Sequence, residues 1–233
     1  MKMRSCSVLV LLVAMLLAPL GVRAAGLDAN VYVIHGIPGQ DLGLPNELPV
    51  DIKINGNVAL TNVPFGGIAG PLTVPAGKYE VEVRVAAAEP GTGPLAMAGT
   101  FYLAVTENAT IVAHLTEEGI PKLTKFINDM RSFSNSMGTR LVVRHGASAP
   151  NVTVGIAGKE TYRFLYNLSN GNQAGLDLKG GSFKATLYPL LSLKPVFGPV
   201  DVSLDAGTAY FAYAVGSLRS GSFNLVVHSI PLQ

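Results

Sequence analysis

Apolar and polar residues alternate with a period of two along much of this chain, which is the pattern of half-buried β-strands. Residues 79–85 read Tyr-Glu-Val-Glu-Val-Arg-Val, so apolar side chains fall on one face and charged side chains on the other. Continuous apolar or β-branched runs, typical of central strands, occur at residues 111–115, 141–143 and 225–227. No segment has a sustained helical period, and residues 121–133, where a short helix is the alternative, begin with Pro121 and are predicted to be strand. The pattern predicts an all-β protein.

The chain repeats itself, and the repeat defines its organisation. Residues 33–36 (Val-Ile-His-Gly) recur as residues 143–146 (Val-Arg-His-Gly), and residues 50–56 match residues 152–158 in spacing. Three glycines of the first copy have counterparts in the second, which pairs Gly66 with Gly171, Gly70 with Gly175 and Gly77 with Gly181.

The last part of each copy is aligned at a turn that joins two predicted strands. Residues 105–115 are aligned with residues 204–214, which places Asn108 opposite Gly207. Both residue types tolerate the left-handed backbone that strand-joining turns often need.

Each copy holds about seven strand-like runs joined by Gly- and Pro-containing turns, as in an immunoglobulin-like fold. We therefore predict two tandem immunoglobulin-like antiparallel β-sandwich domains, at residues 25–127 and 140–233, joined by a polar linker at residues 128–139. The alternative is one large sandwich that uses all the strands.

The amino terminus has the order of an export signal. Lys2 and Arg4 precede an apolar run, and small residues lead to a predicted cleavage site after Ala24. A membrane anchor is the alternative, but the run is shorter than the ~20 apolar residues that a span needs, and Pro19 ends it. The predicted location is therefore extracellular or periplasmic, with residues 1–24 removed.

Removal of this segment changes the chemistry of the remainder. The sole cysteine, Cys6, leaves with it, so the mature protein has no disulfide or thiol. The 17 basic residues become 14 against 15 acidic ones, and the formal net charge moves from +2 to −1. No basic patch favours a nucleic-acid partner. No later stretch is apolar enough to be a transmembrane helix, since residues 185–204 contain three prolines, a lysine and an aspartate.

The repeated strings resemble a known family. The runs at residues 33–36, 50–56, 62–66 (Asn-Val-Pro-Phe-Gly) and 72–79 (Leu-Thr-Val-Pro-Ala-Gly-Lys-Tyr) are similar to domain-of-unknown-function family 4397 (DUF4397). The first copy departs by an insertion at residues 40–48, and the second is more diverged, with Thr153 in place of Asp51 and Lys-Gly-Gly in place of Pro-Ala-Gly. The resemblance covers nearly the whole mature chain. It implies exported, mostly bacterial β-sandwich domains with no established activity, and it supplies no catalytic residues.

Candidate chemistry is sparse. His35 and His145 hold matching positions in the two copies and are the weak binding candidates, but a structural role in fixing the loop after each strand is favoured. A single histidine does not make a metal site, so no metal or cofactor is predicted. Glu80 and Glu82 share a solvated strand face with Arg84, and no serine has the context of a hydrolase nucleophile. We therefore expect the protein not to be an enzyme.

The remaining hypotheses concern recognition. The leading one is a non-enzymatic binding or adhesion-type module for an unknown protein or polysaccharide of the cell envelope, with recognition by loops such as residues 40–48 and 86–94. The alternatives are a purely structural spacer of the envelope and a hydrolase whose site is assembled from distant loops.

Overall fold

The computed structural model describes residues 27–45, 47–133, 137–159, 161–190, 192 and 194–232. The predicted signal segment and its cleavage site lie outside these residues. Within them the chain is almost entirely β-strand, and one short 3₁₀ helix, η1 (Gly39–Leu42), interrupts the predicted loop at residues 40–48. The strand predicted at residues 121–133 is found at Pro121–Ile127 and ends there.

The first half of the chain forms two four-stranded sheets, in the orders β4-β1-β7-β8 and β3-β2-β5-β6. Its strands are β1 (Asp28–His35), β2 (Val50–Ile54), β3 (Asn57–Val63), β4 (Ile68–Pro75), β5 (Gly77–Val85), β6 (Leu95–Leu103), β7 (Asn108–Leu115) and β8 (Pro121–Ile127).

The second half repeats this order as β12-β9-β15-β16 and β11-β10-β13-β14. Its strands are β9 (Gly138–His145), β10 (Val152–Ala157), β11 (Tyr162–Leu168), β12 (Gln173–Lys179), β13 (Gly181–Pro189), β14 (Phe197–Leu204), β15 (Thr208–Val215) and β16 (Asn224–Pro231). Strand β9 begins at Gly138, inside the segment that the sequence assigned to a linker.

The predicted all-β fold of two sandwiches is confirmed, with two refinements. Each half has eight strands, where the sequence indicated about seven. One pair in each half is parallel, because β1 runs alongside β7 and β9 alongside β15, while the other pairs are antiparallel. We call the halves the first and the second sandwich.

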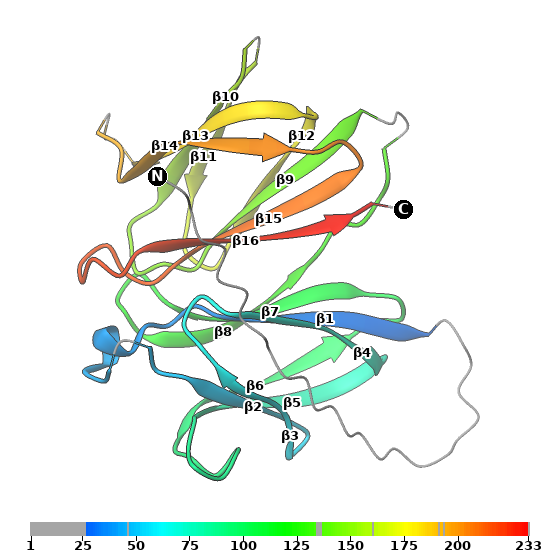
Figure 1. Ribbon diagram of the computed structural model, residues 1–233, viewed down its shortest axis with the longest axis vertical. Helices are drawn as coiled ribbons and strands as arrows, with labels where there is room; N and C mark the ends of the chain where they lie inside the picture. Colours follow the sequence, from blue (N-terminus) through cyan, green and yellow to red (C-terminus); the bar gives the residue numbers. More distant parts are fainter. Residues whose placement is uncertain are drawn as a thin grey trace, which may run out of the picture.

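The two sandwiches stack sheet against sheet, so that the molecule has four layers (Figure 1). Each sandwich has its own apolar core between its two sheets. A third apolar cluster lies between the sandwiches and draws on both, including Ile34, Val112 and Phe126 from the first and Phe211 and Val215 from the second.

This stacking explains two of the three continuous apolar runs in the sequence, those at residues 111–115 and 141–143. The third run, residues 225–227, was wrongly predicted to be a central strand, because it lies on the edge strand β16, where Val227 is 52% exposed. Strands β7 and β9 are buried along almost their whole length, because one face of each covers its own core and the other meets the neighbouring sandwich. Strands buried on both faces lose the alternation that one-sided burial imposes. Strand β5 faces solvent on one side and keeps the alternation.

The register corrects one detail of the repeat. His35 pairs with Ala113 and His145 with Ala214, so the position equivalent to Gly207 is Thr106 and not Asn108. Thr106 has φ 59° and Gly207 φ 73°, so both adopt the left-handed turn conformation. Asn108 is the first residue of β7. The predicted alignment of residues 105–115 with residues 204–214 is therefore wrong by two residues. It matched Gly with Asn because these residue types favour the left-handed conformation more strongly than Thr does.

Candidate functional site

His35 and His145, the sequence-predicted candidates, occupy equivalent and almost fully buried positions at the ends of β1 and β9. The His35 Nε2 atom lies 2.9 Å from the Leu48 carbonyl oxygen, and the His145 Nε2 atom lies 3.0 Å from that of Pro150. A carbonyl only accepts, so Nε2 carries the proton in both rings. Each imidazole thus fixes the loop that follows its strand, and the two rings are not brought into one site.

The opposite ring nitrogen of each histidine is buried with no hydrogen-bond partner among the described residues. Burial lowers the pKa of both His35 and His145 below its ordinary value, because a charged imidazolium would be poorly solvated there. Both rings are neutral at neutral pH, and neither reaches solvent to meet a ligand.

The glycine after each histidine lies against the other sandwich. A Cβ at Gly36 would lie 2.6 Å from Val215 Cγ1, and a Cβ at Gly146 would lie 3.0 Å from His114 Cβ. The Gly216 amide also donates to the Gly36 carbonyl oxygen across the junction, at 3.1 Å. The repeated His-Gly pair therefore fixes a loop through the histidine and allows close contact between sandwiches through the glycine.

The loops predicted to carry recognition are fixed to the body of the protein. Asp41, in the first, accepts a hydrogen bond of 2.7 Å from Ser222 Oγ of the second sandwich. In the second loop, residues 86–94, the Gly91 amide donates to the buried Asp51 carboxylate at 2.7 Å and Arg84 donates to the Gly93 carbonyl at 3.0 Å. Both loops are therefore tied to the body of the protein at these residues.

The junction contains a buried arginine, a feature that the pattern of the sequence did not predict. Arg144 of β9 is 1% exposed, and its guanidinium donates to Tyr213 Oη at 2.5 Å and to the Ile127 carbonyl oxygen of the first sandwich at 3.1 Å. The rings of Phe126, Phe211 and Tyr213 surround it, with centroids 4.6–5.1 Å from Cζ. No carboxylate lies within ion-pair distance among the described residues, so aromatic faces and neutral acceptors hold this cation. Burial lowers the pKa of Arg144.

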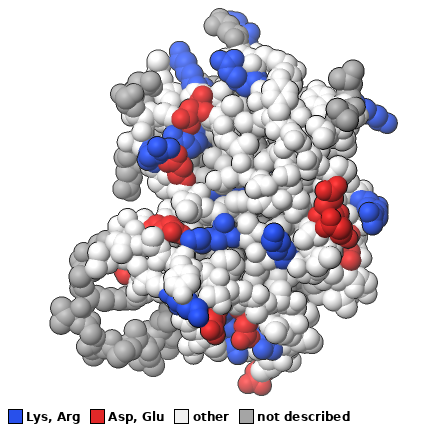
Figure 2. All heavy atoms as spheres, turned by 180° about the vertical axis from the view of Figure 1, so that it is seen from behind, with Lys and Arg blue, Asp and Glu red and all other residues white. Residues whose placement is uncertain are grey.

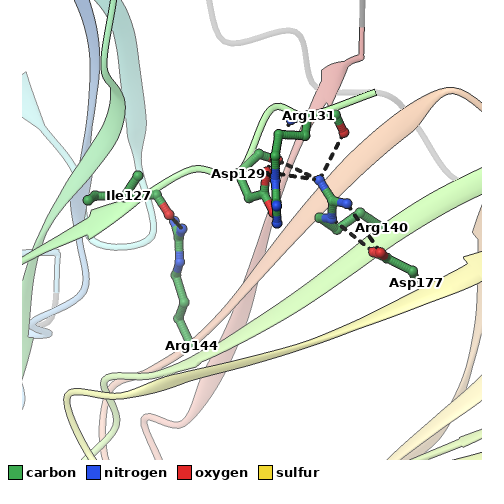
Figure 3. A network of polar contacts seen from close by, with 6 residues as sticks. All are labelled: Ile127, Asp129, Arg131, Arg140, Arg144 and Asp177. Atoms are coloured by element: carbon green, nitrogen blue, oxygen red, sulfur yellow. Dashed lines mark hydrogen bonds and ion pairs between the residues drawn. The ribbon is translucent and has the colours of Figure 1, made fainter. Parts of the chain in front are cut away.

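A second arginine ties down the segment between the sandwiches (Figure 3). Arg140 of β9 donates to the carboxylate of Asp177 at 2.9 Å and to the carbonyl oxygens of Asp129 and Arg131 at 3.2 and 3.0 Å. Hydrogen bonds from Arg131, reinforced by the charge of Arg140, hold the pKa of Asp129 at about 2. The connection at residues 128–133 is therefore held against the second sandwich.

The described residues offer little catalytic equipment. They contain no group of three His, Cys, Asp or Glu side chains placed to bind a metal ion. An apolar cavity of about 180 Å³ lies between the sheets of the second sandwich, and a polar cleft of about 200 Å³ lies where Ser148 and Ser217 of the second sandwich meet Asp41 and Glu118 of the first. Neither His35 nor His145 lines either space.

The most distinctive exposed feature is a row of aromatic side chains on the edge strand β11. Tyr162, Phe164 and Tyr166 alternate along it, and the two tyrosines are 57% and 71% exposed. The ring centroids of Tyr162 and Phe164 are 4.8 Å apart, and those of Phe164 and Tyr166 are 5.2 Å apart. We call these three residues the aromatic row. The sequence signal was three aromatics at i, i+2 and i+4 in a chain with 7% aromatic residues.

Charge on the surface is dispersed. Figure 2 shows the back of the molecule, where Lys and Arg side chains lie in small groups among Asp and Glu side chains on a mostly uncharged surface. That face has no broad basic region of the kind that binds nucleic acid. Among the described residues no helix is long and apolar enough to cross a membrane.

The family is decided by a match over residues 29–155 to the family model described as "Domain of unknown function (DUF4397)". This chain belongs to the DUF4397 family. The match confirms the resemblance seen in the first copy. It covers the first sandwich and extends only to β10 of the second, so the DUF4397 model does not itself show a second copy.

Comparisons beyond the DUF4397 family are distant. No curated protein matches the chain in sequence. Among solved structures, the Bacillus anthracis TIE protein is 11% identical with a TM-score of 0.25, over 82% of this chain and 34% of that one. Candidate cell adhesion proteins of Bacteroides ovatus and Bacteroides uniformis are 7% and 9% identical, with TM-scores of 0.28 and 0.26. They are covered over 99% and 98% of their length, and each match spans 90% of this chain. The chain thus spans about a third of the TIE protein and nearly all of the two Bacteroides proteins.

Proposed function

We propose that this protein is an exported, non-enzymatic binding or adhesion-type module of the cell surface or periplasm, with the second sandwich as a diverged second copy of the family domain. The observation that carries the proposal is the aromatic row, because Tyr162 and Tyr166 expose large ring surfaces that the fold does not bury. Exposed aromatic side chains are enriched at recognition surfaces, since they offer large contact area at little cost in conformational entropy.

The scaffold supports this use. The aromatic row lies on a sheet whose other face covers the core of the second sandwich through Leu165 and Leu168. The junction around Arg144 fixes the second sandwich to the first. A ligand bound by the aromatic row is therefore attached to both sandwiches as one unit. A surface on rigid strands loses little conformational entropy on binding.

The junction also favours one alternative. Because Arg144 and the apolar cluster between the sandwiches lock the two halves together, the same molecule is suited to act as a rigid spacer of the envelope. A spacer needs a stable junction but no exposed aromatic surface, so the two functions depend on different residues.

The deciding experiment is retention of the purified mature protein on envelope fractions of its own cells. We expect retention of the wild type and its loss in the double variant Tyr162→Ala/Tyr166→Ala. A wild-type protein that passes through the envelope fractions without retention contradicts the binding function and favours the spacer.

A further inference from the structure

The outer face of the sheet β11-β10-β13 is built so that aromatic rings stand above small residues. Gly155 of β10 pairs with Phe164 of β11, and a Cβ at Gly155 would lie 3.3 Å from Phe164 Cε1 and 3.5 Å from Tyr188 Cε2. The rings of Phe164 and Tyr188 thus both border a position without a side chain. Tyr188 of β13 extends the aromatic row across the sheet to a second strand.

This arrangement is absent from the first sandwich. The equivalent strand β3 contains no aromatic residue, and register places Val58 and Lys53 where the second sandwich has Phe164 and Gly155. A loop also covers this part of the first sandwich, since a Cβ at Gly91 would lie 2.5 Å from Val58 Cγ2. The fold therefore does not require the aromatic face, which is a property of the second sandwich alone.

The charges on this face do not favour a polyanion. The cations on β10, β11 and β13 are Arg163 and Lys184. Lys184 pairs with Asp201 at 2.7 Å, and Arg163 donates to the Tyr162 carbonyl oxygen at 3.1 Å. Nucleic acids and other polyanions are bound by grooves of unpaired Lys and Arg that follow the backbone. The face fits an uncharged ligand.

The neighbours of the rings favour a sugar over an apolar protein surface. The outward residues beside them on β10 and β13 are Thr153, Gly155 and Thr186, without the Met and Arg that are enriched in protein interfaces. A pyranose ring presents weakly positive C–H groups on its face and hydroxyls at its edge. An aromatic ring has a negative face that attracts such C–H groups, and tyrosine hydroxyls both donate and accept hydrogen bonds.

We propose that the aromatic face of the second sandwich, formed by the aromatic row and Tyr188, binds an uncharged polysaccharide whose sugar rings stack on the exposed tyrosines. This inference rests on the binding function proposed above and names its ligand class. The row places its three rings at successive outward positions of β11, with Tyr162 edge-on to Phe164 at 89° and Tyr166 tilted by 35° to Phe164. A sugar chain lying along the strand would therefore meet the two exposed tyrosines at separate points.

The test uses the mature protein, its Tyr162→Ala/Tyr166→Ala variant, and Tyr102→Ala as a matched control. Tyr102 is 68% exposed on β6 of the first sandwich, so the control removes a comparable exposed ring from a surface outside the aromatic face. Affinity electrophoresis through gels that contain soluble β-glucan, xylan or starch measures binding to uncharged chains. Retention is also measured on envelope fractions treated with periodate, which destroys sugar diols, or with protease. Thermal unfolding of each variant checks that the fold is intact.

We expect at least a tenfold loss of glycan affinity in the double variant, none in the Tyr102→Ala protein, and envelope retention that periodate removes and protease leaves. Retention that survives periodate but not protease, or that the double variant keeps, overturns the glycan inference while the binding function stands. Absence of retention on both the untreated envelope and the glycan gels overturns both proposals together.

Discussion

Tyr213 of the second sandwich donates a hydrogen bond of 3.0 Å to Thr110 Oγ1 of the first. The same hydroxyl accepts from Arg144, so one phenol oxygen links a buried cation to the neighbouring sandwich. Thr110 in turn donates to Asn128 at 3.2 Å. The junction is therefore a continuous polar chain within an apolar cluster, and its members depend on one another.

Replacing Tyr213 by phenylalanine tests this chain. The substitution keeps the ring but removes one buried hydrogen bond from Arg144 and one from Thr110, so we expect the free energy of unfolding to fall by about 1–3 kcal/mol. Urea unfolding followed by circular dichroism measures it. The control is Tyr210→Phe on the same strand, whose hydroxyl bonds Asp205 in an exposed turn. An equal loss of stability in the two variants would show that burial of these hydrogen bonds does not contribute to stability.

Replacing Gly36 by alanine tests the close contact between the sandwiches. The new Cβ would meet Val215 Cγ1 at 2.6 Å and the Ala113 carbonyl oxygen at 2.9 Å, so we expect a loss of about 1–3 kcal/mol in stability from overpacking. Addition of Val215→Ala should restore only part of it, because the carbonyl remains. Gly175→Ala is the control, since its Cβ would meet nothing closer than 3.4 Å. A neutral Gly36→Ala protein would contradict the close contact.

The buried histidines predict a loss of stability in mild acid. Burial lowers the pKa of His35 and of His145 in the folded state, while the unfolded chain keeps a value near 6.5. Below pH ~6.5 the unfolded state therefore binds more protons, so stability is complete above this pH and falls as the pH drops toward the lowered values. Each histidine contributes a slope of at most about 1.4 kcal/mol per pH unit.

Urea unfolding between pH 7.5 and pH 5 measures that slope. His35→Gln retains a neutral donor toward the Leu48 carbonyl and removes one titrating group, so its slope should be shallower than that of the wild type. An unchanged slope would mean that His35 is not responsible for the acid loss.

The cavity of the second sandwich predicts a stabilising substitution. Register makes Ala212 the counterpart of Ile111, which lies in the core of the first sandwich, and the cavity of about 180 Å³ lies beside this alanine. Ala212→Ile should raise stability by roughly 1 kcal/mol by filling it. The reciprocal change, Ile111→Ala, should lower stability by about 2–5 kcal/mol. Calorimetry measures the stability of both variants. Destabilisation by Ala212→Ile would show that the cavity cannot accept the isoleucine side chain.

Export predicts a defined mature terminus. Cleavage after Ala24 removes Lys2, Arg4, Cys6 and Arg23, so protein recovered from the periplasm or medium should begin at Ala25 and contain no thiol. Intact-mass spectrometry and a thiol assay measure both properties. A secreted product that still carries Cys6 would contradict the predicted cleavage.

The period-two pattern of residues 79–85 was sufficient to predict a strand, because β5 faces solvent on one side and its alternation reflects local burial. The family strings, carried by turns of defined geometry such as Gly66 and Gly77, were equally readable. Turn residues act through their own backbone conformation, so their meaning does not depend on distant parts of the chain.

The candidate site was much less predictable. His35 and His145 stood out by repetition, but only the fold showed that each bonds a loop carbonyl away from solvent. Tyr162 and Tyr166 alternate like any strand residues, and the sequence does not say which face of β11 remains uncovered.

By itself the sequence determined the strands and the duplication, and it predicts the export signal, since these depend on periodicity, turn chemistry and composition within short stretches. The tertiary structure decided that the two sandwiches stack sheet on sheet, that Arg144 is enclosed at their junction, and that Phe164 and Tyr188 both border Gly155. These features join residues far apart in the chain. Their energies arise from packing and desolvation, which exist only once the sheets have formed.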